Sequence, residues 1–292
     1  MSDQGTVSQN DSKGRGRSLA GFARSRPTKP GETYGVPGQG NTTWLSFATI
    51  AALIFLWWAI TAAGLVKPLF VPSPQSIVQK FVDVWVNGFT GTPLWQHILI
   101  STARVFGAFV LACIIGIPLG LAMGMSPIMR GIFDPPIEIY RPVPPLAYLP
   151  LMIIWFGIGE TSKVLLIFLS VFAPIALGAR AGVRSAAIEQ IHAAYSFGAT
   201  RWQVMRHIIL PSAMPEILTA MRIGIGFGWT TLVAAEMVAA TKGIGYMVLS
   251  ASQFLQTSTV IMGIFVIAAI AYAFDMLMRF LERRLVPWKG KM

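Results

Sequence analysis

The chain has 292 residues, of which 54% are hydrophobic and only 12% are charged, and its formal net charge is +11. The charged share is about half that of an average soluble domain, which argues against a soluble globular protein. The basic balance by itself would suit a nucleic-acid binder, but the distribution of Lys and Arg along the chain argues against that class.

Residues 1–43 are rich in Gly, Ser, Pro, Lys and Arg and show no apolar periodicity. Such a segment buries too little apolar surface to offset the entropy of ordering, so we expect a disordered tail. Residues 44–66 then form an uncharged apolar run that reaches about 34 Å as a helix, enough to cross a bilayer. The polar lead is too long for a cleaved signal peptide. We therefore predict an N-terminal membrane anchor, followed by an extracytoplasmic segment at 67–97.

Further apolar runs predict additional membrane spans. They lie at about 98–125, 143–158, 163–183, 217–240 and 259–278. Together with the anchor they predict an all-α polytopic membrane protein with six transmembrane helices, the third of them short and rich in proline. We expect residues 98–281 to form the membrane domain and residues 282–292 to form a basic cytoplasmic tail.

Lys and Arg are distributed unevenly between the two sides of this topology. If both termini are cytoplasmic, the cytoplasmic segments are 1–43, 126–142, 184–216 and 279–292, with six, two, three and five of these residues. The opposite side holds only Lys67, Lys80, Lys163 and Lys242. This is the positive-inside bias of a membrane protein with both termini in the cytoplasm, and it explains the basicity without a nucleic-acid partner.

Glycines recur every four residues in two of the spans. They are Gly116, Gly120 and Gly124 in the second span, and Gly224 and Gly228 in the fifth. Such a strip lets the backbone of a neighbouring helix approach closely, so we predict helix packing at these positions. The alternative is that the glycines face lipid without a helical partner.

The stretch HAAYSFGATRWQVMRHIILP, residues 192–211, is a polar segment between the fourth and fifth spans. We predict a short helix capped by Ser185 and ended by Gly198 in the left-handed conformation. The run Thr200–Gln203 has the spacing of a capping box and begins a second helix, which Pro211 ends. Two short helices with apolar and basic faces predict a docking element for a soluble partner.

This segment resembles the cytoplasmic loop of permease subunits of ABC importers, whose motif is E-A-A, three residues, G, nine residues, I-x-L-P. The matching positions hold Ala193, Ala194, Gly198, Ile208, Leu210 and Pro211. His192 occupies the position where the motif has Glu. Two further stretches, 126–163 and 228–248, resemble the nitrate, sulfonate and taurine branch of these permeases.

The resemblance implies a type I permease fold and a translocation subunit without enzyme activity or cofactor. It implies an ATP-binding subunit docked on a coupling loop at 184–215, an extracytoplasmic substrate-binding protein, and a homodimer of permeases in membrane lipid. The implied cargo is a small anionic or zwitterionic solute, taurine or another alkanesulfonate, with nitrate as the alternative.

Motifs for other activities are missing from the sequence. There is no G-x-x-x-x-G-K-[ST] phosphate loop and no H-E-x-x-H, and His97, His192 and His207 are too scattered for a metal site. An ion-coupled secondary transporter is the less favoured alternative, because it needs buried carboxylates and only Glu236 lies deep within a span.

Arg104 and Glu236 lie at similar depths below the outer ends of the second and fifth spans. An isolated charge at this depth is costly, so we predict that they approach each other, within one chain or across the dimer, as a possible gate. The alternative is that each extends separately to the interface. The short third span predicts a pathway lining at 141–156, including Arg141, Pro144 and Pro145.

For three other ionisable residues we expect ordinary solvent-facing environments and no role in transport. Glu160 and Lys163 fall in a short outer loop, where we expect them to be solvated. Arg222 lies about six residues into the fifth span and is expected to extend toward the cytoplasm.

Overall fold

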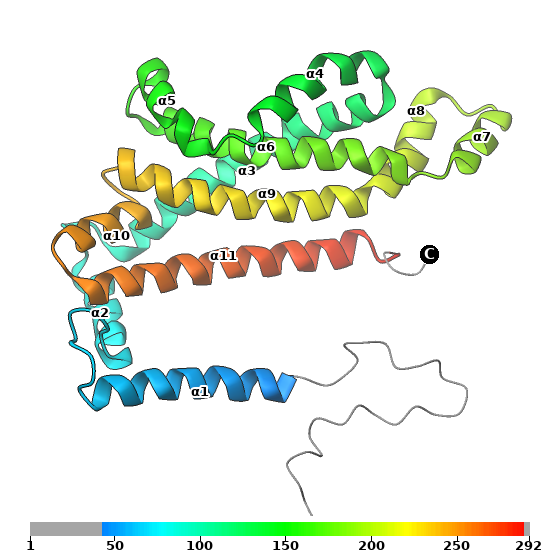
Figure 1. Cartoon of the computed structure of the whole chain (residues 1–292). Helices are drawn as coiled ribbons and strands as arrows, with labels where there is room; N and C mark the ends of the chain where they lie inside the picture. The colour runs from blue at the N-terminus through cyan, green and yellow to red at the C-terminus, as the bar shows by residue number, and fades with distance from the viewer. Residues whose placement is uncertain (1–42, 289–292) are drawn as a thin grey trace, which may run out of the picture. The chain divides into compact units, whose positions relative to one another are not determined.

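The computed structural model describes residues 43–288, which are helical and contain no β-strand. The α-helices are α1 Thr43–Ala62, α2 Pro74–Asn87, α3 Leu94–Met125, α4 Pro127–Tyr140, α5 Leu149–Phe156, α6 Glu160–Gly182, α7 Ile188–Ser196, α8 Arg201–Val204, α9 Leu210–Ala239, α10 Ile244–Gln253 and α11 Thr257–Leu285 (Figure 1). Two 3₁₀ turns, Pro145–Tyr148 and Val183–Ser185, and a π-helical turn, Met205–Ile209, connect some of them. Almost all of the predicted 1–43 tail, and the end of the basic tail, lie outside the described residues.

The chain divides into two compact units, Met1–Ala59 and Ile60–Met292. Most of α1 belongs to the first unit, and its apolar stretch Trp44–Ala62 has 19 residues. This gives about 28 Å of helix, close to the thickness of the hydrocarbon core. A helix long and apolar enough to cross a membrane is therefore present at the span predicted for 44–66, and it ends slightly earlier.

Five helical runs in the described part of the chain are long and apolar enough to cross a membrane. They are Trp44–Ala62, Leu94–Met125, Glu160–Ser185, Arg201–Ala239 and Thr257–Leu285. The third predicted span differs: instead of residues 143–158, only the shorter apolar run Pro145–Phe156 is helical. At about 18 Å this run is too short to cross a bilayer alone.

The relative direction of α3 and α6 shows that the chain between them must return along the bundle. Gly116 lies against Ile175, and Gly124 lies against Val183, so the two helices run parallel. The intervening residues 126–159 must therefore return across the membrane once.

The return crossing is divided between α4 and α5. Asp134 of α4 pairs with Arg180 near the end of α6, whereas Tyr140, the last residue of α4, has its hydroxyl 3.5 Å from the carbonyl oxygen of Leu169 near the middle of α6. Leu149 and Met152 of α5 pack in one cluster with Leu166 and Ala239, beyond that level. We counted 126–142 among the cytoplasmic segments, whereas most of these residues form the helix α4, which runs along α6 from the level of Arg180 to that of Leu169.

Prolines explain why this crossing is broken. Pro142, Pro144 and Pro145 lack a backbone N–H donor, and each one disfavours helical geometry in the residue before it. The chain therefore leaves the helix after Tyr140 and forms only a 3₁₀ turn before α5 begins at Leu149.

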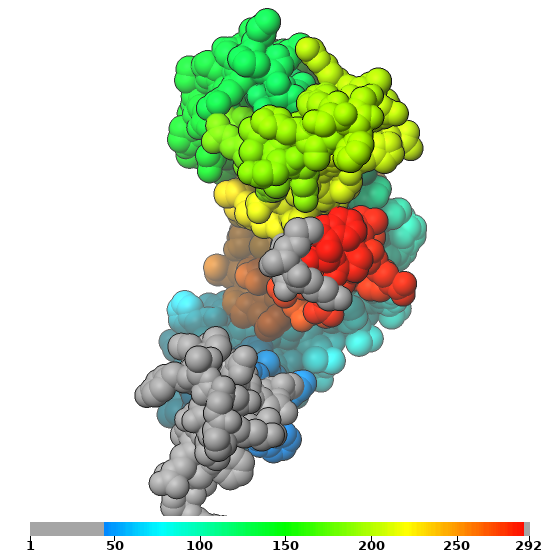
Figure 2. All heavy atoms as spheres, turned by 90° about the vertical axis from the view of Figure 1, so that its right-hand side faces the viewer, coloured from blue at the N-terminus to red at the C-terminus, as the bar shows by residue number. Residues whose placement is uncertain are grey.

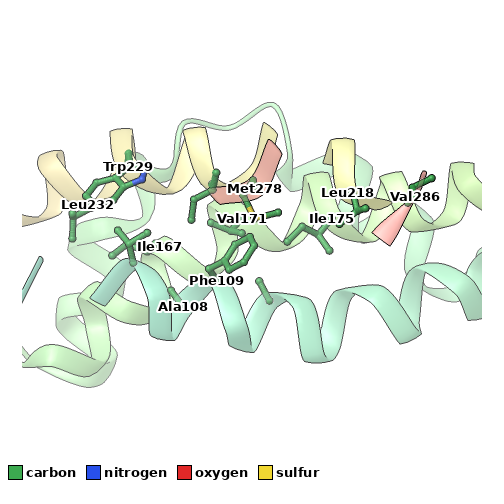
Figure 3. Close-up of a cluster of buried hydrophobic side chains, with 13 residues drawn as sticks. Ala108, Phe109, Ile167, Val171, Ile175, Leu218, Trp229, Leu232, Met278 and Val286 are labelled. Atoms are coloured by element: carbon green, nitrogen blue, oxygen red, sulfur yellow. The ribbon is translucent and has the colours of Figure 1, made fainter. Parts of the chain in front are cut away.

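The centre of the bundle is formed by α3, α6 and α9, with α11 against them. Figure 3 shows apolar side chains from all four helices meeting, among them Phe109, Val171, Trp229 and Met278. Glycines permit this close packing: a Cβ added to Gly120 would overlap Ala176, and one added to Gly228 would lie 2.9 Å from the side chain of Val171.

All five glycines predicted to pack helices face α6. A Cβ added to Gly116 would lie 3.3 Å from Ile175, one added to Gly124 would overlap Val183, and one added to Gly224 would lie 3.2 Å from the carbonyl oxygen of Val171. Direct contact replaces lipid at these positions, so dispersion between the backbones holds the helices together.

Candidate functional site

The segment from α7 to α8, residues 188–204, forms a helical hairpin at one end of the bundle. Gly198 has φ +81°, in the left-handed region. Ala199 N donates to Ala194 O at 3.0 Å and Gly198 N donates to Tyr195 O at 2.9 Å, the two hydrogen bonds that close a Schellman motif. Thr200 and Gln203 form a complete capping box at the start of α8.

Two local expectations about the hairpin are wrong. The residue that caps α7 is Ala187, with no side-chain hydrogen bond, and not Ser185. Pro211 does not end the second helix, because the π-helical turn Met205–Ile209 joins α8 to α9 and Pro211 falls in the first turn of α9. A π-helical turn changes the local hydrogen-bond pattern, so the helix continues through a residue that lacks an N–H.

The hairpin presents large apolar side chains to its surroundings. Phe197 is 92% exposed and Trp202 is 64% exposed, with Tyr195 also exposed. His192 and Ala193 are exposed as well, whereas Ile208 and Leu210 are partly covered. In Figure 2, which views the bundle from this end, the yellow-green α7–α8 segment faces the viewer. Phe197 directly precedes the predicted turn, but no sequence pattern indicated that it would be exposed.

At the opposite end of the bundle, four charged residues form an ion cluster: Arg104, Glu160, Lys163 and Glu236. Arg104 is 5% exposed, and its Nη1 donates to Glu236 Oε1 at 2.6 Å. The same guanidinium binds both carboxylate oxygens of Glu160, through Nε at 2.6 Å and Nη2 at 2.7 Å. The structure thus brings Arg104 and Glu236 together within one chain, and adds a second carboxylate.

Glu236 is completely buried and accepts hydrogen bonds from three residues on two helices, α3 and α10. Besides Arg104 of α3, its donors are Ser101 Oγ at 2.8 Å and the backbone N–H of Gly245 at 2.9 Å. Lys163 is 4% exposed and donates to the carbonyl oxygen of Ala239 at 3.2 Å. Two cations and two carboxylates balance within the cluster, of which Arg104, Lys163 and Glu236 are buried while Glu160 remains 61% exposed.

Gly243 and Gly245 allow the loop after α9 to cover this carboxylate. Gly243 has φ +128°, and a Cβ there would overlap the carboxylate of Glu236. A Cβ on Gly245 would lie 2.7 Å from the carbonyl oxygen of Val233. The sequence signal, a Gly-x-Gly between two helices, was present but indicated no partner.

Three ionisable residues lie in environments that differ in part from the predicted ones. Glu160 and Lys163 lie in the first turn of α6 and not in a loop, and both belong to the ion cluster; Lys163 is buried, whereas Glu160 is 61% exposed, as predicted for a solvated residue. Arg222 does not extend freely: it pairs with Asp275 at 3.0 Å and with Glu282 at 3.5 Å. Glu160 and Lys163 also pair with each other within one turn of α6. The remaining partners come from other helices, which periodicity along one segment does not indicate.

A cleft of about 490 Å³ lies beside the break between α4 and α5. Arg141, Pro144 and Pro145 line it on one side. The other walls come from α6, including Pro174, and from α9, including Glu216 and Phe227. The structure therefore places the three predicted pathway residues in one cleft, away from the ion cluster. Among the described residues, no group of His, Cys, Asp and Glu is arranged to hold a metal ion.

Known transport proteins are similar to this chain over most of its length. Residues 116–287 match the family model described as binding-protein-dependent transport system inner membrane component. The taurine transport system permease protein TauC of Escherichia coli is 54% identical over 248 residues, covering 85% of this chain and 90% of that protein. A putative aliphatic sulfonates transport permease protein, SsuC of Bacillus subtilis, is 34% identical and covers 87% of this chain and 91% of its own length.

A solved structure supports the same fold at low sequence identity. A chain of the MetNI methionine ABC transporter, in an inward-facing conformation, superposes with a TM-score of 0.57 at 17% identity. The match covers 66% of the present chain and 97% of that chain. At this identity the likeness establishes the fold alone.

Proposed function

We propose taurine or another alkanesulfonate as the cargo of this chain, which belongs to the family of binding-protein-dependent transport system inner membrane components. The chain is a multi-pass membrane protein and a permease subunit of an ABC importer, and ATP is hydrolysed by a separate subunit. The observation that carries the choice of cargo is the 54% identity to a taurine permease over 85% of the chain. The aliphatic-sulfonate relative supports the same class of head group.

The hairpin is the proposed docking site for the ATP-binding subunit. The run Arg201–Ala239 has 39 residues, about 58 Å of helix, which is longer than a bilayer is thick. One end must therefore project into water, and the hairpin end carries the exposed Phe197 and Trp202 together with the basic Arg201 and Arg206. Membership of the family supplies a partner for this surface, and we assign the hairpin end to the cytoplasm.

On this assignment the ion cluster lies toward the extracytoplasmic side, where a substrate-binding protein delivers the solute. Arg104 holds Glu236 of α9 and Glu160 of α6 at once, so the cluster joins three helices. We infer that it fixes the outer end of the bundle as one body, against which a gate closes. Since the donors around Glu236 are already Ser101, Arg104 and Gly245, the cluster does not favour an ion-coupled transporter, which needs a carboxylate free to take up protons.

The cleft beside the α4–α5 break is the proposed lining of the translocation route. Broken membrane helices are tolerated where they face protein or a water-filled cavity, and such breaks often mark substrate pathways. Two copies of the chain, embedded in lipid, would enclose the route between them. With both termini cytoplasmic, the exposed hairpins of both copies face the ATP-binding subunits.

Reconstitution tests the cargo directly. The permease is assembled with its ATP-binding subunit and binding protein in proteoliposomes, and uptake of labelled taurine is measured with ATP. Unlabelled ethanesulfonate is expected to compete, whereas nitrate is expected to compete weakly or not at all. ATP-dependent nitrate uptake without sulfonate uptake would instead establish the nitrate alternative.

A further inference from the structure

The break between α4 and α5 places Arg141 at mid-depth in the bundle. Tyr140, immediately before it, lies against Leu169, nine residues from the start of α6 and thus about 14 Å along that helix. Tyr148, after the break, donates from its hydroxyl to the carbonyl oxygen of Tyr140 at 3.0 Å, so both sides of the break stay at this level. A guanidinium at such depth is costly unless water or an anion meets it.

Arg141 differs from the arginines inside the membrane-spanning helices. Arg104 pairs with Glu236, Arg180 with Asp134, and Arg222 with Asp275. Arg141 is exposed, lines the cleft, and forms no ion pair or side-chain hydrogen bond within the described part of the chain. Its charge is therefore available to a solute in the cleft.

The hydroxyl groups that line the cleft are already used as donors. Ser170 donates to Ile167 O at 2.7 Å, and Thr219 donates to Pro215 O at 2.8 Å. The two tyrosines at the ends of the break face backbone carbonyls in the same way. Among the described lining side chains, the guanidinium of Arg141 is the donor that remains.

We propose that Arg141 binds the anionic head group of the solute as it passes through the cleft, with apolar side chains such as Ile223 and Phe227 beside its alkyl part. A guanidinium presents parallel N–H donors that match two oxygens of a sulfonate, whereas the surrounding side-chain oxygens can only accept. The volume of about 490 Å³ leaves room for water around a small sulfonate. Water in the cleft competes for the guanidinium, so we expect the solute to be released again, as a transport route requires. The inference rests on the proposed function, because it takes the head group from that cargo class.

The test compares Arg141→Gln, Arg141→Lys and a control, Arg283→Gln, in proteoliposomes with the ATP-binding subunit and taurine-loaded binding protein. Arg283 is an exposed arginine near the end of α11, outside the cleft. Taurine uptake and ATP hydrolysis are measured on the same preparation. We expect Arg141→Gln to lower taurine imported per ATP hydrolysed about tenfold, because a charge-assisted hydrogen bond is lost. Arg141→Lys should fall between, and the control should match the wild type.

Stimulation of ATP hydrolysis by loaded binding protein and the thermal unfolding midpoint are expected to stay unchanged in Arg141→Gln, since the residue holds no structural partner. A parallel fall in uptake, ATP hydrolysis and unfolding midpoint would assign Arg141 a structural role and overturn the inference. Unchanged uptake per ATP would overturn it as well. A wild-type complex that imports no sulfonate refutes the proposed function, whereas normal wild-type uptake with an unaffected Arg141→Gln refutes only the binding role.

Discussion

The ion cluster and the hairpin, at opposite ends of the same bundle, satisfy their side chains in opposite ways. In the cluster, Glu236 is completely buried and every partner comes from the same chain. In the hairpin, Phe197 is 92% exposed although the backbone of the turn is fully closed by local hydrogen bonds. The charged side chains of the cluster find their partners within one chain. In the hairpin the backbone hydrogen bonds of the turn are made, but large apolar side chains remain exposed. We therefore expect changes in the cluster to affect folding, and changes in the hairpin to affect association.

The largest effect is expected from Gly243→Ala in the loop over Glu236. The added Cβ would overlap the carboxylate, and φ +128° is a strained conformation for alanine. Strain and a disrupted buried ion pair together predict a loss of about 4 kcal/mol or more. The fraction of extracted protein that elutes as a single species should fall sharply. Gly226→Ala is the control, since nothing lies within 4 Å of its added Cβ. Equal yields of both variants would contradict the prediction.

Glu236→Gln removes one charge from the ion cluster and is expected to cost about 3 kcal/mol of unfolding free energy. In a cycle with Arg104→Gln, the double variant should lose about 1–3 kcal/mol less than the two single changes added together. Asp275→Asn, in a partly exposed pair, should cost below about 1 kcal/mol. Denaturant unfolding of the solubilised protein measures these values.

A charge swap, Arg104→Glu with Glu236→Arg, tests whether these two residues act as an isolated pair. It should not restore stability, because a glutamate at position 104 would face Glu160, which Arg104 now binds through two hydrogen bonds. Full recovery in the swapped protein would show that Arg104 and Glu236 act as an isolated pair.

Phe197→Ser tests whether the exposed surface of the hairpin binds the ATP-binding subunit. Burial of this ring against a partner should contribute about 2 kcal/mol, so the affinity for the ATP-binding subunit is expected to fall about thirtyfold. The unfolding free energy of the isolated permease should not change. Phe254→Ser is a matched control, because Phe254 is also exposed but lies between α10 and α11, away from the hairpin. Equal loss of affinity in both variants would argue against docking at the hairpin.

The smallest effect is expected from Gly198→Val, which strains the turn without a steric clash. Nothing lies within 4 Å of the added Cβ, but φ is +81°, which a β-branched residue resists by roughly 1–2 kcal/mol. ATP hydrolysis stimulated by loaded binding protein should fall while membrane insertion remains normal. Gly198→Asn is the control, since asparagine tolerates this conformation. Wild-type transport by the valine variant would show that the turn geometry is not needed for coupling.

Much of the hairpin could be predicted because its backbone depends on neighbours in sequence. The capping box at Thr200 and Gln203 and the left-handed Gly198 involve residues three to five positions apart, which a sequence shows directly. The prediction that Pro211 ends the second helix was wrong. Whether a helix ends at a proline depends on whether the preceding turn can rearrange, and here it does so as a π-helical turn.

By itself, the sequence determined the long apolar spans, the glycine strips and the caps of the hairpin, because each depends on periodicity or on hydrogen bonds within a few residues. Tertiary structure decided which charges meet. Arg104 reaches Glu160 across 56 positions and Glu236 across 132, and depth along a helix predicted the second contact but not the first. It also decided that α4 lies along α6, since the acidic residues Asp134 and Glu138 are paired by Arg180 of that later helix. Burial of a charge is favourable only when a partner lies opposite, and that partner is fixed by packing between helices.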